Sequence, residues 1–208
     1  MIKLTKKEKA VFVKTFRQTL YFILTFSFIF IIHAIADKYK TDTFNEHSIV
    51  ENIQLTFLVL SGWIFVINGI FNKKFRPVLF LLASLSFLAS CRELDMFFDK
   101  TVKIVGWEVG FIFPISAIIY ALKHRRTLRN TLIEFYSSPA FHMMCCAMII
   151  VFPVAQCIGH GPFVRDVLGI QNIADIKELF EESGETIGYF LILLSSVEFY
   201  LSLLKDKK

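Results

Sequence analysis

Apolar residues fall in long runs along the chain, and short polar or charged stretches separate the runs. A helix needs roughly 20 apolar residues to cross the hydrocarbon core of a bilayer, which is about 30 Å thick. Because several runs approach this length, the pattern predicts an all-α membrane protein, a bundle of about six transmembrane helices. The expected spans are about 18–36, 52–71, 77–98, 106–122, 139–158 and 186–204, within a single transmembrane domain covering 1–208.

Lysine and arginine are shared unevenly between the two sides that such a bundle would have. The amino-terminal segment, the 72–76 and 123–129 loops and the carboxyl-terminal tail fall on one side and hold 16 of the 23 basic residues. Short loops rich in these residues stay in the cytoplasm. We therefore expect a multi-pass protein of a bacterial inner membrane with its N and C termini in the cytoplasm.

The bulk composition agrees with a lipid environment. Hydrophobic residues make up 55% of the chain and phenylalanine alone contributes 24 residues, which suits lipid-facing surfaces. The net charge of +5 comes from short basic clusters between apolar runs and not from one basic face, so we expect no nucleic-acid partner. The expected partners are the lipid bilayer and either a second copy of the chain (a homo-oligomer) or a cytoplasmic protein docked on the basic loops.

The longest connection between spans, about 159–185, falls on the expected outer side. Asn172 followed by Asp175 resembles a helix start, and apolar residues recur after it at helical spacing. These observations predict an outer amphipathic segment at about 163–182, which would lead into the last span and cover the outer face of the bundle.

Charged side chains near membrane depth concentrate at the expected outer ends of the spans. Asp95 and Asp99 lie at a helix carboxyl end, where the helix dipole disfavours negative charge, so another group must stabilise them. Arg92 shares their helix face and is expected to pair with one of them, whereas Glu93 points elsewhere and needs a separate partner. Because charges at membrane depth usually mark a functional site, we predict Glu93, Asp95 and Arg92 as catalytic candidates.

A second set of residues at the same ends has the chemistry of a metal site. His47 and Glu51 are four residues apart and share a helix face, and His160 has the same spacing from Gln156. Carboxylates with one or two imidazoles suit a divalent metal ion, although Glu51 can equally be explained as part of a capping box with Ser48. The predicted metal ligands are His47, Glu51, Asp99, His160, Glu182 and Glu185.

Small residues mark the start of the last expected span. Ser183, Gly184 and Gly188 contain a small-xxx-small pattern, which allows another helix to approach closely. We therefore expect this helix to be central in the bundle and to present Glu182 and Glu185 inward.

Three short motifs carry a resemblance to known proteins. The strings Glu51-Asn52-x-Gln54, Arg92-Glu93-x-Asp95-x-x-Phe98-Asp99 and Glu182-x-x-Glu185-x-x-Gly188-Tyr189 resemble those of small polytopic inner-membrane proteins of bacteria whose function is uncharacterised. The resemblance spans about 47–200 and implies a membrane bundle but no activity. The zinc-dependent ceramidase-like and adiponectin-receptor-like hydrolases share a bowl of carboxylates, but their HxxxH pair is missing here.

Two hypotheses from different classes follow. In the first, the outer cluster holds a divalent metal ion and acts on a lipid or envelope substrate, with its carboxylates as ligands or general bases and Arg92 orienting them. In the second, the chain is a non-catalytic sensor or scaffold subunit of a multi-protein system, for example in phage defence, and the charges form structural ion pairs.

Overall fold

The computed structural model describes residues 5–39, 49–95, 106–155 and 174–205, and every regular element in these ranges is a helix. The elements are α1 (Lys6–Tyr39), α2 (Ile49–Phe71), α3 (Arg76–Glu93), the 3₁₀-helix η2 (Trp107–Phe111), α5 (Ile112–Lys123), α6 (Arg125–Tyr136), α7 (Pro139–Ile149), the π-helix η3 (Ile150–Ala155) and α10 (Ala174–Lys205). The all-α fold expected from the sequence is confirmed for this part of the chain.

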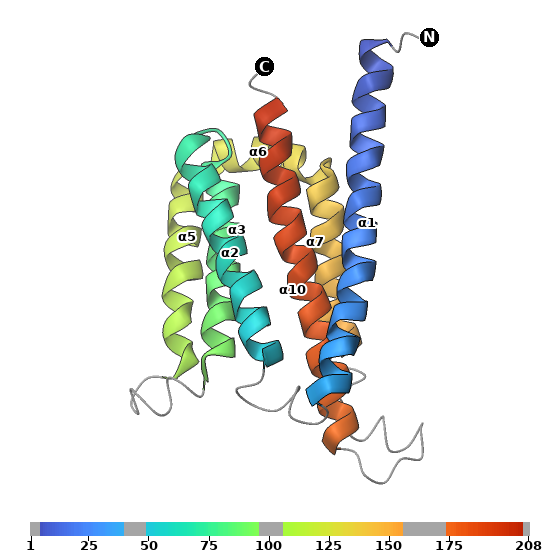
Figure 1. The fold of residues 1–208 in the computed structure, drawn as a ribbon. Helices are drawn as coiled ribbons and strands as arrows, with labels where there is room; N and C mark the ends of the chain where they lie inside the picture. The colour runs from blue at the N-terminus through green and yellow to red at the C-terminus, as the bar shows by residue number, and fades with distance from the viewer. Residues whose placement is uncertain (1–4, 40–48, 96–105, 156–173, 206–208) are drawn as a thin grey trace.

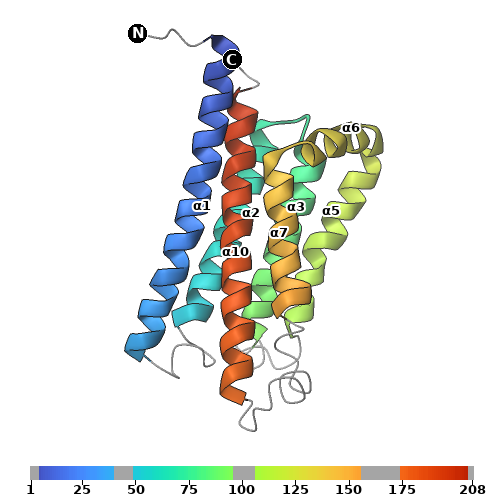
Figure 2. The ribbon, with the colours of Figure 1, turned by 90° about the vertical axis from the view of Figure 1, so that its right-hand side faces the viewer.

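The long helices run side by side, and one short helix lies across them. Figures 1 and 2 show α1, α2, α3, α5, α7 and α10 along a common direction, with α6 crossing from α5 to α7 at one end. Both termini and the turn between α2 and α3 lie at that same end, which is called the termini end below. The chain therefore returns to the side on which it starts, as a bundle with an even number of crossings would.

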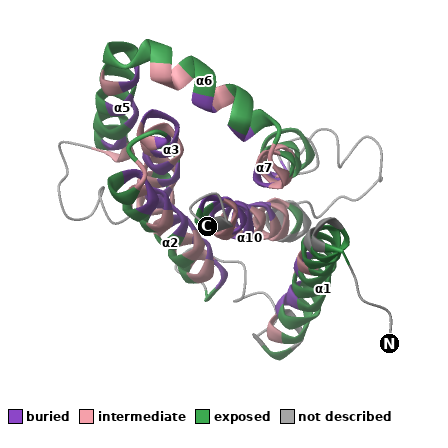
Figure 3. Cartoon of the chain, turned by 90° about the horizontal axis from the view of Figure 1, so that it is seen from above, coloured by how far each residue is buried: buried purple, intermediate pink, exposed green. Residues whose placement is uncertain are grey.

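α10 is the helix around which the others pack. It contacts α1, α2, α7 and η3, and lies between them when the bundle is viewed from above (Figure 3). A Cβ atom added to Gly184 would lie 2.9 Å from Cβ of Ala155, and one added to Gly188 would overlap Cγ2 of Val151. The small residues of α10 therefore allow α7 and η3 to approach closely, as the small-xxx-small pattern predicted.

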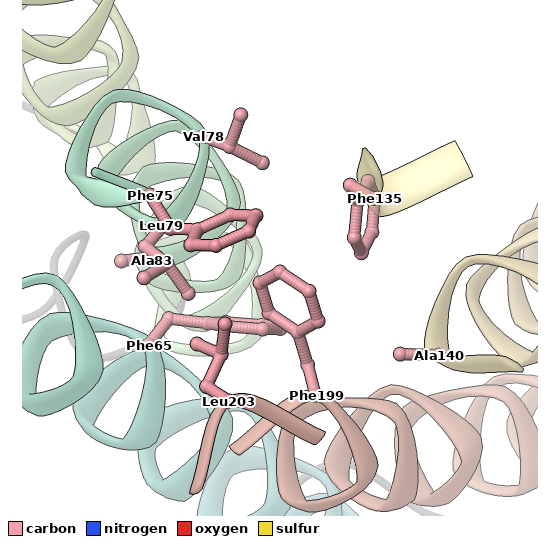
Figure 4. Close-up of a cluster of buried hydrophobic side chains, with 9 residues drawn as sticks. All are labelled: Phe65, Phe75, Val78, Leu79, Ala83, Phe135, Ala140, Phe199 and Leu203. Atoms are coloured by element: carbon pink, nitrogen blue, oxygen red, sulfur yellow. The ribbon is translucent and has the colours of Figure 1, made fainter. Parts of the chain in front are cut away.

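A hydrophobic cluster near the termini end joins five helices (Figure 4). Aromatic rings form its centre, where Phe199 of α10 meets Phe75 edge-on at 5.5 Å and Phe135 of α6 at 5.0 Å between ring centroids. Phe135 thereby ties the crossing helix α6 to the bundle. The cluster consists of Phe65, Phe75, Val78, Leu79, Ala83, Phe135, Ala140, Phe199 and Leu203.

α1 is attached to the rest of the bundle at two places. Towards the end opposite the termini, Phe28 stacks on Phe190 at 4.5 Å and meets Phe57 edge-on at 5.3 Å. Nearer the termini end, Arg17 and Tyr21 reach Glu198 of α10. Most other apolar side chains of α1 are exposed, which is the expected state of a helix that faces lipid on several sides.

Several helices are suited to a membrane, and the protein is a membrane protein. Among the described residues three segments are long and apolar enough to cross a bilayer: Val11–Ile35, Ile49–Phe71 and Phe180–Leu204. The number is four if α6 and the α7–η3 helix, bent by 82° relative to each other, form one broken span. This is fewer than the six spans expected.

The remaining candidates are shorter or more charged. α3 has 18 residues and carries three charged side chains, those of Arg76, Arg92 and Glu93. α5 has 12 residues and continues directly from the five residues of η2, so the two together are about 28 Å long.

The described helices differ from the expected spans at three places. α3 ends at Glu93, earlier than the expected boundary near 98. α10 begins at Ala174 and is continuous to Lys205, so 174–182 forms the first turns of a long helix and not a separate outer segment; 163–173 lie outside the described residues. The basic stretch at 123–129 was expected to be a loop, but its residues from Arg125 onwards form the start of α6.

Candidate functional site

Seven polar side chains from three helices meet at the end opposite the termini. Four of them lie on α10 at positions i, i+3, i+4 and i+7, a spacing that places them on one face of the helix. α2 packs against α10, and α3 packs against α2 and reaches α10 through long polar side chains; these two helices contribute the others. The group, called the polar cluster below, consists of Gln54, Arg92, Glu93, Glu182, Glu185, Thr186 and Tyr189.

An ion pair between α3 and α10 is at the centre of the polar cluster. Nη2 of Arg92 donates to both carboxylate oxygens of Glu185, at 2.6 and 2.7 Å. The Glu185 side chain is 3% exposed and that of Arg92 is 41% exposed. The buried carboxylate of Glu185 is thus neutralised by the guanidinium of Arg92, which is itself partly exposed.

Tyr189 links this pair to a second carboxylate. Its hydroxyl donates to Oε1 of Glu93 at 2.8 Å and accepts from Nη2 of Arg92 at 3.3 Å. Nη2 of Arg92 also lies 3.2 Å from Oε1 of Glu93. The sequence predicted that Glu93 needs its own partner, and that partner is Tyr189 on α10.

Gln54 of α2 completes the polar cluster. Its Nε2 lies within hydrogen-bonding distance of Oε2 of Glu182 at 2.8 Å, of the Glu182 backbone carbonyl at 3.1 Å and of the Thr186 hydroxyl at 2.9 Å. Its Oε1 is buried and has no hydrogen-bond partner among the described residues. A buried acceptor without a donor is costly, so this oxygen is a point at which a cation or a donor would be stabilised.

The charges of the polar cluster do not balance. Its described residues include one guanidinium, that of Arg92, and three carboxyl groups, those of Glu93, Glu182 and Glu185, of which Arg92 pairs with Glu93 and Glu185. Burial makes uncompensated charge costly. The polar cluster therefore favours cations over anions, except at the exposed edge of Arg92.

An apolar cavity of about 310 Å³ adjoins the polar cluster. It lies between α3 and the α7–η3 helix, with residues of α2 and α10 also in its wall, and Arg92 and Tyr189 are its polar residues next to the ion pair. Ser86 also lines it, but the hydroxyl of this residue already donates to a backbone carbonyl. The apolar part of the wall includes Leu58, Leu82, Leu85, Leu88, Met144, Met148 and Phe152.

A second buried ion pair lies nearer the termini end. Nη2 of Arg17 donates to Oε1 of Glu198 at 2.6 Å, and the Tyr21 hydroxyl donates to Oε2 at 2.9 Å. The Glu198 side chain is 1% exposed and that of Arg17 is 15% exposed. This group joins α1 to α10, about 20 Å from Glu185 along the helix axis.

The structure places four of the predicted site residues together. Arg92, Glu93, Glu182 and Glu185 all belong to the polar cluster. Asp95 is half-buried after the end of α3, and no hydrogen bond or ion pair joins it to another described residue. The expectation that Arg92 pairs with Asp95 is corrected, because its partners among the described residues are Glu185, Glu93 and Tyr189. A pairing with Asp99 stays a prediction, since Asp99 lies outside the described residues.

The predicted metal ligands are only partly within the described ranges. Glu51 is half-buried in the first turn of α2, whereas His47, Asp99 and His160 lie outside the described residues. Within the described part of the chain, no group of three or more His, Cys, Asp and Glu side chains is placed to hold a metal ion. Metal binding is therefore not supported by these residues, and it stays a prediction.

Several contributors to these networks do not stand out in the sequence, among them Tyr21, Thr186 and Tyr189. An aromatic residue near a membrane boundary often serves as an anchor, so the position of Tyr189 indicates no role in a site by itself. Glu198 does carry a signal, because a lone carboxylate inside an apolar run indicates an inward-facing group with a partner. Its partner Arg17 is one of six basic residues in the amino-terminal segment, and nothing in the sequence distinguishes it from the others.

Comparison with protein-family models, with curated proteins and with solved structures found no match for this chain. The resemblance of its motifs to bacterial inner-membrane proteins stays a prediction.

Proposed function

We propose that this protein is a multi-pass protein of a bacterial inner membrane that binds the apolar chain of a lipid or envelope-linked amphiphile. The binding site is the cavity between α3 and α7, in the outer half of the membrane. The observation that carries the proposal is the pairing of this apolar cavity with the guanidinium of Arg92. The protein then acts as a lipid-binding sensor or scaffold subunit, in which the ion pairs hold the helices around the ligand.

The chemistry of the cavity supports an amphiphile. Small-molecule sites commonly enclose about 300 to 1,000 Å³ and combine apolar walls with a few polar groups, and this cavity has both properties. All the bonds that Arg92 makes to other described residues use Nη2. Its Nη1 and Nε are therefore left to donate to phosphate, carbonyl or hydroxyl oxygens of a head group.

The proposed topology has six spans with both termini in the cytoplasm. The shared position of the termini and α6 at one end agrees with this topology, and so does the gathering of basic residues in the segments at that end. η2 and α5 together are about 28 Å long, close to the thickness of the hydrocarbon core. α5 also exposes a row of large apolar side chains, namely Ile112, Ile115, Ile118, Ile119 and Leu122.

Photolabelling tests the lipid site. Protein purified in detergent micelles is incubated with a phospholipid that carries a diazirine in its acyl chain, and labelled residues are identified by mass spectrometry. We expect adducts on Met144 or Met148, which line the cavity. Ala89→Phe fills the cavity and should abolish these adducts, whereas Ala34→Phe, on the exposed surface of α1, should leave them unchanged.

Two results would contradict the proposal. One is labelling of Met144 and Met148 that is no stronger than labelling of exposed residues on α1. The other is labelling that persists in a folded Ala89→Phe variant. Monodisperse elution and an unchanged melting temperature identify the folded variants.

Reporter fusions test the topology. A green fluorescent protein fused after Lys208 should fluoresce, because it becomes fluorescent only in the cytoplasm. Alkaline phosphatase at the same position should be inactive, because it is active only in the periplasm. The opposite pair of results would place the termini outside and would also move the cavity to the inner half of the membrane.

A divalent metal ion at the polar cluster is the second candidate, and it carries the hypothesis of an enzyme acting on an envelope substrate. The observation in its favour is the Oε1 of Gln54, a buried acceptor without a hydrogen-bond partner among the described residues, on the same amide group as the Nε2 that contacts Glu182. Oxygen ligands of this kind suit calcium or magnesium. Ligands from His47, Asp99 or His160 would have to complete the site.

Elemental analysis separates the metal site from the scaffold function. Wild-type protein is compared with Glu93→Gln and Glu182→Gln, each checked for monodisperse elution. Stoichiometric metal that is lost in the variants would support the metal site. Variants that lose thermal stability while the wild type holds no stoichiometric metal would support ion pairs with a structural role.

A further inference from the structure

A groove of about 490 Å³ lies between α1 and α7, on the opposite side of α10 from α3. Leu191 of α10 lies in its wall, and the side chains on both flanks come from one face of each helix. On α1 they recur from Lys14 to Thr25 at helical spacing, and on α7 from Pro139 to Cys146. The groove is separate from the polar cluster and from the cavity beside Arg92, with which it shares no residue.

The groove changes from polar to apolar along its length. Lys14, Gln18, Ser137 and His142 lie towards the termini end, because α1 and α7 both begin there. Phe22, Cys146 and Leu191 lie further along the helices, where the one hydroxyl among the described lining residues beyond Phe22, that of Thr25, already donates to a backbone carbonyl. A ligand that matches both parts has a polar head at the termini end and an apolar chain running into the bundle.

The length of the groove matches one leaflet of a bilayer. Lys14 and Thr25 are separated by 11 residues of α1, or about 16 Å along the helix axis. Half of a hydrocarbon core of about 30 Å is close to this length. A lipid chain that enters beside Lys14 would therefore reach the middle of the membrane at the inner end of the groove.

The charges at the polar end favour an anion. None of the described residues that line the groove is a carboxylate, and Glu198, which accepts from the lining residue Tyr21, is already neutralised by Arg17. Lys14 forms no ion pair with another described residue. Its ammonium group is therefore available as the counter-ion of a phosphate.

We propose that this groove is a binding site for one anionic phospholipid of the cytoplasmic leaflet. The phosphate lies at Lys14, within reach of Gln18 and His142, and an acyl chain runs along Phe22 and Met143 to Leu191. The lipid fills the space between α1 and α7, beside the point where Arg17 and Tyr21 attach α1 to Glu198. The proposal rests on the cytoplasmic position of the termini proposed above, and it is independent of the cavity beside Arg92.

Native mass spectrometry measures whether the groove prefers an anionic lipid to a zwitterionic one. The delipidated full-length protein is titrated with phosphatidylglycerol or with phosphatidylcholine of the same acyl chains. We expect a first phosphatidylglycerol to bind preferentially and Lys14→Gln to weaken it about fivefold, the factor expected for one basic residue at a membrane surface. Lys9→Gln, an exposed lysine of α1 outside the groove, should change the affinity by less than Lys14→Gln. Equal binding of the two lipids, or equal effects of the two variants, would overturn the proposal.

Cys146 provides a second test that does not depend on affinity. Its side chain is exposed and lines the groove, so a bound lipid should shield it. A protein with Cys146 as its only cysteine is reconstituted in nanodiscs of phosphatidylcholine or of an equal mixture with phosphatidylglycerol, and its maleimide labelling is timed. We expect slower labelling in the mixture and recovery of the fast rate with Lys14→Gln.

The remaining outcomes identify other occupants. Labelling at one rate in both membranes would overturn the proposal and indicate either any bilayer lipid or an open groove. Protection that depends on protein concentration would overturn it in favour of a second copy of the chain. Ala89→Phe, which fills the other cavity, should leave both measurements unchanged, so failure of the lipid cavity and failure of this groove are distinguishable.

Discussion

Arg92 of α3 holds both carboxylate oxygens of Glu185 of α10 through a single nitrogen, Nη2, at 2.6 and 2.7 Å. The two residues are 93 positions apart in the chain, yet their pairing joins two helices beside the lipid cavity. Because one nitrogen makes both bonds, the other edge of the guanidinium keeps its donors for a ligand. The ion pair thus both fixes the helices and orients a binding group.

A double-mutant cycle measures this pairing. We expect Arg92→Gln and Glu185→Gln each to lower the unfolding free energy, with a coupling of about 1 to 2 kcal/mol between them, the range found for polar contacts inside membranes and other coupled pairs. Thermal unfolding in detergent, followed by loss of monodisperse protein, provides the measurement. Additive effects of the two changes would show that the pair contributes no interaction energy.

The buried ion pair between α1 and α10 should contribute more to the unfolding free energy than an exposed ion pair does. Glu198→Gln leaves Arg17 partly uncompensated in a site where the carboxylate is 1% exposed, so we expect a loss of about 3 to 5 kcal/mol. Glu134→Gln is the matched control, because its partner Lys74 lies at 2.6 Å but both side chains are exposed. That change should cost less than about 1 kcal/mol. Similar melting temperatures for the two variants would contradict the structural role of Glu198.

The close approach of α10 and α7 should not tolerate a side chain at Gly188. A methyl group there meets Cγ2 of Val151 and lies 3.3 Å from the carbonyl oxygen of Ala147, so Gly188→Ala should destabilise the protein by about 1 to 3 kcal/mol. Gly69→Ala is the control, because the methyl group would mainly meet the ring of Phe80, a side chain that can move. We expect Gly69→Ala to lower the melting temperature less than Gly188→Ala, because the branched side chain of Val151 has less freedom to move than the ring of Phe80. Equal melting temperatures of the two variants would contradict the close approach at Gly188.

The stability of the first turn of α1 should depend on pH. Thr5 and Glu8 form a capping box, in which the Thr5 backbone N–H and hydroxyl donate to the Glu8 carboxylate at 2.7 and 2.8 Å. These bonds lower the pKa of Glu8 below its ordinary value. The cap is therefore present at neutral pH and is lost as the pH falls through this lowered pKa.

Nuclear magnetic resonance can follow this change through the chemical shifts of the first helical turn in a labelled sample. We expect the turn of the wild type to fray as the pH falls through the lowered pKa of Glu8. Glu8→Gln should show no such transition. A wild-type turn that stays helical with protonated Glu8 would show that the cap does not stabilise it.

Hydropathy was sufficient to predict the helices of the bundle, because a long apolar run in a membrane has few alternatives to a helix. The main helix that the hydropathy pattern did not predict is α6. Its basic residues suggested a loop, but Leu128, Thr131 and Phe135 recur at helical spacing and pack inward. This pattern was present in the sequence and could have been recognised.

The partners of the charged residues were harder to predict. Spacing along one helix favoured Asp95 and Asp99 for Arg92, since residues three or four apart share a face. The structure instead ends α3 at Glu93 and brings Glu185 and Tyr189 of α10 against it. Which helix lies opposite a charge depends on how the helices pack, in this case α3 and α10 each against α2, and one sequence does not reveal it.

The pairing of Arg17 with Glu198 also bears on synthesis. The two residues are 181 positions apart, in the first and last helices that the structure describes. At about 5 to 20 residues per second, the ribosome needs roughly 10 to 40 s to make Glu198 after Arg17. During this interval Arg17 lacks the partner that it has in the folded protein, so this attachment of α1 forms only after α10 has been made. A truncated product that ends before Glu198 would leave Arg17 without this partner and α1 without this attachment to the bundle.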